Sequence, residues 1–151
     1  MPLTRTTHWA TQEFDKFLRA HATTPFAWGT NDCCLFPANA IKAFTGFDLA
    51  DDFRGKYHDE ASAFALIKSV TGGATVEDAA AWCAQKHGLV EWMHGGKAAP
   101  LLAQRGDLVV LEDAGRLIAG VMHLRGTKAV SVGENGLKLL PLSTLKRAWR
   151  V

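Results

Sequence analysis

The sequence predicts an α+β fold in which helices fill the first half of the chain and a small antiparallel sheet fills the second. Apolar residues recur at helical spacing as far as about Gly88, and short apolar runs separated by glycines follow from Leu108 onward. An Asn135-Gly136 pair joins two of these runs, which is a strong hairpin signal. The 151 residues fit one domain, 1-151, large enough to bury a core.

The first two helices are placed by apolar spacing and by their caps. The first covers roughly Thr11 to Ala22, where phenylalanines recur at helical intervals. The second starts at Asn31 and Asp32, whose side chains can accept hydrogen bonds from the first free backbone N–H groups. It runs to about Phe44 and is closed by Gly46.

Two further helices follow a polar loop. The third is capped by Asp59 and ends before the Gly72-Gly73 pair. The fourth starts at Thr75, which forms a capping box with Asp78 three residues later. It carries Trp82 and Cys83 and stops at Gly88.

Four apolar runs in the second half are predicted to be strands because they are short and are separated by glycine-containing turns. They are Leu108–Leu111, Leu117–Leu124, Lys128–Val132 and Leu137–Leu140. We expect Ser143 to Trp149 to form a last helical turn.

Composition argues against several classes of protein. The net charge of +2 gives no electrostatic case for a nucleic acid or an anionic membrane as partner. No run of 18 apolar residues is present, so no membrane span is expected. Met1 to Thr7 is not followed by an apolar stretch, so we expect no secretory signal.

The three cysteines do not form a recognisable framework. Cys33 and Cys34 are adjacent and Cys83 is distant, so no disulfide pattern is expected and the chain is predicted to be made in a reducing cytosol. Neither CxxC nor HExxH is present, so we predict no metal site and no cofactor.

Cys33 is the one residue at which the sequence places a candidate for chemistry. It falls in the first turn of a predicted helix, where the helix dipole favours thiolate over thiol. A thiolate is a nucleophile for acyl transfer, and backbone N–H groups at the helix start can stabilise an oxyanion. A core role explains the position equally well, because Cys33, Phe36, Ala40 and Phe44 would share one helix face.

The stretch around Cys33 resembles the nucleophile motif of NlpC-like cysteine peptidases, which have a papain-like fold. Trp28-Gly29-x-x-Asp32-Cys33 is similar to the family's segment at the start of the central helix. Arg105–Val109 resembles a later Gly-Asp strand, and the order of motifs from Thr11 to Val132 follows the family. The resemblance implies that Cys33 is the candidate nucleophile, supported by Trp28, Gly29 and Asp32.

The chain departs from that family at the general base. The family's histidine begins a His-Val-Gly-Ile strand, and Ile118-Ala119-Gly120-Val121 stands here instead. Isoleucine cannot take a proton, so the thiolate loses its proton shuttle. His123 is the candidate substitute, although a strand would point it to the opposite face from residue 118. Ser131 is the nearest polar candidate for the third triad position.

The whole chain also resembles small NlpC-like proteins encoded in the tail-gene modules of tailed bacteriophages. The similarity includes Trp28–Phe36, Phe53–Tyr57 and the C-terminal stretch Pro141–Val151. It implies a tail-tip or tail-assembly protein that is made in the host cytoplasm, resides in the virion tail and contacts other tail-tip or hub proteins. Peptidoglycan is the further partner that the resemblance implies.

Two hypotheses follow from these observations. In the first, the protein keeps the peptidase fold as a catalytically degenerate component of the tail tip, because Ile118 replaces the histidine. In the second, it is an active peptidoglycan endopeptidase in which Cys33 attacks and His123 or another histidine is the base. The five tryptophans, which could stack on carbohydrate, are more typical of core packing.

Overall fold

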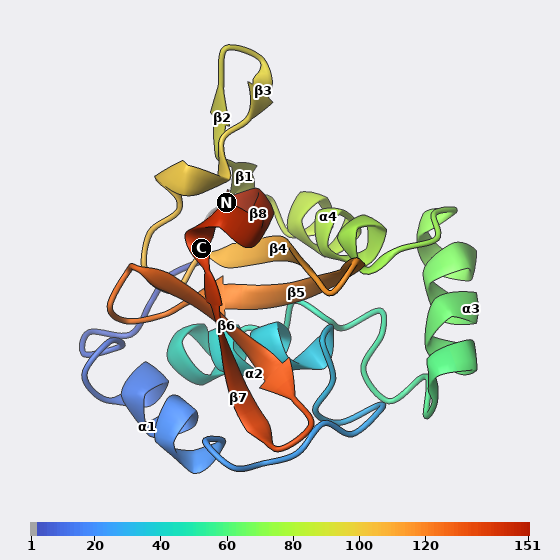
Figure 1. The fold of residues 1–151 in the computed structure, drawn as a ribbon, viewed down its shortest axis with the longest axis horizontal. Helices are drawn as coiled ribbons and strands as arrows, with labels where there is room; N and C mark the ends of the chain where they lie inside the picture. The colour runs from blue at the N-terminus through green and yellow to red at the C-terminus, as the bar shows by residue number, and fades with distance from the viewer. Residues whose placement is uncertain (1–2) are drawn as a thin grey trace.

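The computed structural model describes residues 3–151 as an α+β fold with four helices and an antiparallel sheet, as the sequence predicts (Figure 1). The helices are α1 (Glu13–Ala20), α2 (Leu35–Thr45), α3 (Glu60–Thr71) and α4 (Val76–Lys86). The strands are β1 (Val90–Glu91), β2 (Met93–His94), β3 (Lys97–Ala98), β4 (Leu108–Asp113), β5 (Arg116–Met122), β6 (Lys128–Gly133), β7 (Gly136–Pro141) and β8 (Leu145–Arg150).

The four helices form close to where the sequence predicts them, although α2 begins at Leu35, three residues after Asp32, because Pro37 has no N–H group to donate to Cys33 O. The starts of α3 and α4 are set locally. Asp59 accepts a hydrogen bond from Ser62 N at the start of α3, and Thr75 accepts one from Asp78 N at the start of α4. Gly46 closes α2 with left-handed backbone, φ +75°, which suits a residue without a Cβ atom.

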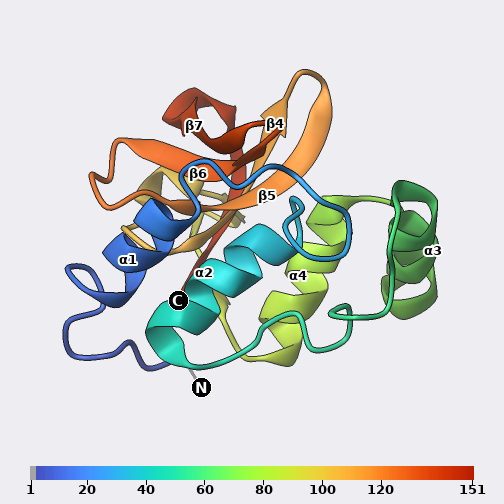
Figure 2. The same cartoon turned by 90° about the horizontal axis from the view of Figure 1, so that it is seen from below.

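The main sheet has the order β1-β8-β4-β5-β6-β7, and β2 and β3 form a separate hairpin that projects from the body (Figure 1). Glu134 and Asn135 connect β6 to β7, which begins at Gly136, and the two strands form the hairpin that the Asn-Gly signal predicts. Helices α2 and α4 pack against the sheet, and α1 lies beside α2 (Figure 2).

The expectation of a helical turn from Ser143 to Trp149 is wrong. Only Leu142–Thr144 forms a short 3-10 turn, and Leu145 to Arg150 is strand β8, which pairs with β4 and β1. The register between β4 and β8 shifts at Val110 and Leu111, which is a bulge. The bulge interrupts the two-residue alternation of β8, so its buried residues follow a spacing that resembles a helix.

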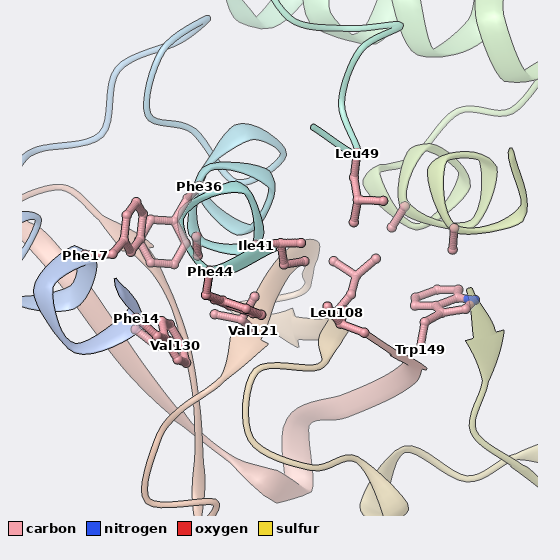
Figure 3. Close-up of a cluster of buried hydrophobic side chains, with 14 of the residues drawn as sticks. Phe14, Phe17, Phe36, Ile41, Phe44, Leu49, Leu108, Val121, Val130 and Trp149 are labelled. Carbon is pink, nitrogen blue, oxygen red and sulfur yellow. The ribbon is translucent and has the colours of Figure 1, made fainter. Parts of the chain in front are cut away.

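The main core lies between the helices and one face of the sheet (Figure 3). Phe14 of α1, Phe36 and Phe44 of α2, and Val121 and Val130 of the sheet are all fully buried there. The phenylalanine rings of Phe14 and Phe44 pack 5.1 Å apart. This core fixes the position of α2, and α2 in turn places Cys33 against β5.

Candidate functional site

The turn that leads into α2 is held by the carboxylate of Asp32, which is fully buried. Its Oδ1 atom accepts hydrogen bonds from the backbone N–H groups of Cys34 and Leu35, both at 2.9 Å. Its Oδ2 atom accepts one from Gly29 N at 2.9 Å and one from the Tyr57 hydroxyl at 2.5 Å. All four acceptor positions are therefore occupied, and Asp32 caps the helix as the sequence predicts.

Asn31 does not cap the helix. Its side-chain amide donates instead to the backbone carbonyls of Pro25, at 2.9 Å, and Thr24. This contact is the physical reason for the difference, because it turns the amide toward the preceding loop. Asn31 thereby ties the end of that loop to the turn that carries Cys33.

Gly29 and Tyr57 explain the shape of the same turn. Gly29 has φ +84°, and a Cβ atom there would lie 2.7 Å from the carbonyl oxygen of Tyr57. Burial and the hydrogen bond to Asp32 raise the pKa of the Tyr57 hydroxyl, which therefore acts as a fixed donor. The sequence motif includes Gly29, but it gives no sign of the role of Tyr57. The acceptor of the Tyr57 hydroxyl, Asp32, lies 25 residues away along the chain.

Cys33 lines an open cleft of about 450 Å³ and is 8% exposed. It packs in one apolar cluster with Val76 of α4, Ala119 of β5 and the partly buried side chain of Ile118. The rest of the cleft wall is also mostly apolar and includes Phe26, Trp28, Phe64, Leu117 and Val132. The four charged residues that line it are Asp113, Arg116, Glu134 and Lys138.

The charged residues of the cleft are largely paired. Lys138 binds Asp113, and Arg116 binds Glu60 at 3.1 Å. Of the four charged residues, Glu134 alone has no ion-pair partner among residues 3–151. The two groups that β5 contributes to the cluster around Cys33 are the side chains of Ala119 and Ile118, and neither can accept or donate a proton.

No histidine lines this cleft, and all six histidines lie in the described residues 3–151. They are found in other parts of the molecule: His8 and His21 near α1, His58 before α3, His87 after α4, His94 in β2 and His123 after β5. The structure therefore provides no imidazole beside the Cys33 thiol.

His123 follows the end of β5, which is the end remote from Ile118. Its Nδ1 atom accepts a hydrogen bond from Arg125 N at 3.2 Å, and its backbone N–H donates to Lys128 O at 2.9 Å. Burial lowers the pKa of His123, and the charge of Arg125 acts in the same direction. His123 thus has a structural place in the turn between β5 and β6.

Ser131 is fully buried on β6, next to β5. Its hydroxyl donates to the backbone carbonyl of Ala119 at 2.7 Å. The adjacent Gly120 leaves room for this approach, because a Cβ atom there would meet the carbonyl oxygen of Val130. Ser131 therefore joins two strands, and the structure does not bring it together with a histidine.

The two remaining thiols are held in their protonated form. The hydrogen bond to Cys33 and burial raise the pKa of Cys34 well above its ordinary value. Burial, with Asp51 and Asp52 nearby, raises the pKa of Cys83 to about 12. Neither thiol is suited to act as a nucleophile at neutral pH.

A second buried carboxylate, Asp107, organises another part of the molecule. Its Oδ1 atom accepts from Arg5 Nη2 and Val151 N, both at 3.0 Å. Its Oδ2 atom accepts from Trp92 Nε1 and Gln104 N, both at 2.8 Å. The sequence indicates Asp107 only as part of the Gly-Asp motif, since three of these partners are more than ten residues away.

Residues 3–151 contain neither a metal-binding cluster nor a helix that could span a membrane. No three histidine, cysteine, aspartate or glutamate side chains there converge on a point that could hold a metal ion. Within the same residues, each helix is too short or too polar to cross a membrane.

Comparison with known proteins identifies the family of the chain. The family model of DUF6950, which is described as a domain of unknown function, matches residues 4–151. The chain belongs to this family. No curated protein and no solved structure matches the chain significantly. The match covers both the Cys33 cleft and the Asp107 network, so both belong to the domain that the family defines.

Proposed function

We propose that the protein is a tail-tip or tail-assembly component of a tailed bacteriophage, with a papain-like NlpC-type fold and a degenerate catalytic site. The sequence resemblance to small tail-module proteins supports the tail assignment. The observation that carries the loss of catalysis is the environment of Cys33. The thiol packs against Ile118 and Ala119, and no histidine lines the cleft within the described chain.

The arrangement of elements supports the papain-like part of the proposal. In that fold a cysteine at the start of a central helix faces an antiparallel sheet whose strand carries the base. Here Cys33 lies two residues before Leu35, the first residue of α2, and β5 contributes Ala119 and Ile118 to the cluster around it. Without an imidazole the thiol has neither a stabiliser for its thiolate nor a donor for the leaving group.

The turn chemistry adds a second reason for low reactivity. A helix N-terminus favours a thiolate through its positive end and its free N–H groups. In this protein the carboxylate of Asp32 already occupies the N–H groups of Cys34 and Leu35 and places a negative charge beside Cys33. The remaining field is therefore weaker than the sequence position of Cys33 suggests.

The chemical part of the proposal is tested by restoring the missing base. Purified wild-type protein is expected to release no fragments from peptidoglycan. Its Cys33 is expected to react with iodoacetamide near neutral pH no faster than in the unfolded chain. An Ile118→His variant is expected to accelerate Cys33 alkylation, because an imidazolium would stand beside the thiol. Peptide mass spectrometry reads the reaction of each cysteine separately.

Cys34 and Cys83 provide internal controls in this experiment, and His123→Ala is the matched variant. The rate at Cys33 is expected to be unchanged in His123→Ala. Peptidoglycan cleavage that disappears in Cys33→Ala would overturn the proposal in favour of an active endopeptidase. If cleavage also disappeared in His123→Ala, His123 would be the base.

The tail assignment is tested separately by complementation. Deletion of the gene from the encoding phage is expected to give particles with incomplete tails. A plasmid copy is expected to restore infectious particles whether it carries wild-type protein or Cys33→Ala. Restoration by wild type alone would indicate that the thiol chemistry matters. Normal particles from the deletion would overturn the structural role.

A further inference from the structure

The arginines of this protein fall into two groups. Five of the eight have a carboxylate oxygen within 4.0 Å, and these are Arg5, Arg19, Arg54, Arg116 and Arg147. Within the described residues, Arg105, Arg125 and Arg150 have no such partner. All three are exposed. An unpaired, exposed guanidinium has its full fork of N–H donors available to an outside anion.

The three unpaired arginines lie in the same neighbourhood, around Arg5. The side chain of Arg105 reaches within 3.7 Å of the place where a Cβ atom on Gly126 would lie, so it is adjacent to the turn that carries Arg125. Arg5 donates to the carbonyl of Arg105 at 2.8 Å. Arg5 and Arg150 line one hollow of about 560 Å³. We call Arg5, Arg105, Arg125 and Arg150 the arginine cluster.

Among residues 3–151, side-chain carboxylates do not compensate the arginine cluster, although Arg5 Nε also donates to Val151 O at 3.1 Å. Asp107 is bound to Arg5 and is 1% exposed, and Glu91 in the same hollow is bound to Arg147. Repulsion from Arg105 and Arg150 adds to burial in lowering the pKa of Arg5, against the attraction of Asp107. The whole-chain charge of +2 hides the cluster, because charges elsewhere nearly cancel.

The cluster is separate from the Cys33 cleft. None of its residues lines that cleft, and its Arg125 lies in the turn at the opposite end of β5 from Ile118. The turn after β5 and the N-terminal segment lie on the same side of the molecule (Figures 1 and 2).

We propose that the arginine cluster binds a polymer of phosphate diesters through its phosphate groups. Guanidinium forks match phosphate oxygens in geometry, and they are less strongly hydrated than lysine ammonium groups. The three unpaired arginines come from separate segments, at residues 105, 125 and 150, and do not converge on a single pocket. A ligand with repeated charges can contact several of them at once, whereas one small anion cannot.

Recognition is expected to be independent of bases. Trp92 lines the hollow beside Arg5 and Arg150, where its indole Nε1 donates to Asp107. Trp9 also lies beside the cluster, and Arg5 lies 4.1 Å and Arg105 5.8 Å from the centre of its ring. Arginine contacts therefore already occupy the ring, which leaves it poorly placed to stack on a base. The predicted binding is electrostatic and should weaken steeply as salt is added.

The test measures binding of fluorescent inorganic polyphosphate by anisotropy at a series of salt concentrations. The Arg105→Gln/Arg125→Gln variant leaves the Arg5–Asp107 contact intact and is compared with wild type. Its affinity is expected to fall about tenfold or more, and its salt slope to be smaller, because two phosphate contacts are lost. Circular dichroism checks that the variant folds.

The control variant Arg19→Gln/Lys68→Gln removes the same net charge from exposed positions outside the cluster. It is expected to bind within about twofold of wild type. An equal loss in both variants would mean that only net charge matters, and would overturn the proposal. Absence of polyphosphate binding by wild type would overturn it as well.

Two further sets of binding measurements identify the chemistry of the ligand. Poly(glutamate) that binds as tightly as polyphosphate would indicate an acidic protein partner and overturn the proposal. Duplex DNA and poly(glycerol phosphate) then distinguish the sources of phosphate diesters. Tight binding of either supports the proposal and names the source. Failure of both would overturn the assignment to a phosphate diester polymer.

Discussion

Asp32 and Asp107 are both buried carboxylates that accept four hydrogen bonds, but they connect very different parts of the chain. Asp32 takes three of its four bonds from backbone N–H groups within three residues. Asp107 takes only one from a neighbour, Gln104. Its other donors are Arg5, Trp92 and Val151.

The two carboxylates therefore have different roles: Asp32 shapes a turn, and Asp107 joins remote segments. Asp32 makes one turn rigid and thereby orients Cys33. Asp107 ties the N-terminal segment, the residues after α4 and the end of β8 to β4, and one of its partners is charged. The Trp-Gly-x-x-Asp-Cys motif, which resembles a catalytic motif, thus stabilises a single turn. The less specific Gly-Asp motif connects segments that are far apart in the sequence.

The largest effect is expected from Asp107→Ala. The change would leave the partly buried Arg5 guanidinium and Trp92 N–H group without their buried acceptor. We expect a loss of about 3–5 kcal/mol in the free energy of unfolding, measured with urea. Asp15→Ala, which breaks only an exposed pair with Arg19, is the control and should cost less than about 1 kcal/mol. Equal losses of unfolding free energy in the two variants would show that Asp107 contributes no more than an exposed ion pair does.

A smaller effect is expected from Asp32→Ala. The variant would lose the helix cap and leave the Tyr57 hydroxyl unpaired, at a cost of about 2–3 kcal/mol in the free energy of unfolding. Tyr57→Phe should cost about 1.5 kcal/mol, because it removes only one hydrogen bond to a charged group.

The double variant sharpens this prediction. If the Asp32–Tyr57 contact acts as a pair, the two losses will not add, and the difference will give their coupling free energy. Additive losses would show that Asp32 contributes only through the backbone of the turn.

The contrast between local and long-range contacts also explains which parts of the fold the sequence could predict. Helices α3 and α4 begin at capping boxes whose partners are three residues apart, so their signals are contained in short windows. Strand β8 depends on pairing with β4, almost forty residues earlier, and its bulge removes the alternation that would identify it. Strands β1 to β3 are two residues each, too short for any periodic pattern.

The candidate site divides in the same way. The motif predicted the turn of Trp28, Gly29, Asp32 and Cys33, and Asp32 caps α2 as expected. The contact between Cys33 and Ile118 required the packing of α2 on β5, which only a family resemblance suggested beforehand. The role of Tyr57 could not be predicted, because a tyrosine in a loop gives no sign of its acceptor.

The smallest effect is expected from a surface carboxylate, Asp48, when the pH falls. Two hydrogen bonds from Arg54 lower the pKa of Asp48 below its ordinary value of 3.8. A carboxyl whose pKa is lower in the folded state adds stability above its unfolded pKa and loses it as the pH falls through the folded value. Wild type should therefore lose more stability between pH 5 and 3 than Asp48→Asn, as read from urea midpoints. The control is Glu134→Gln, which removes an exposed carboxylate that has no ion pair in the described chain. Its stability should follow that of wild type. Parallel curves for all three proteins would show that the Asp48–Arg54 pair is too well solvated to couple folding to protonation.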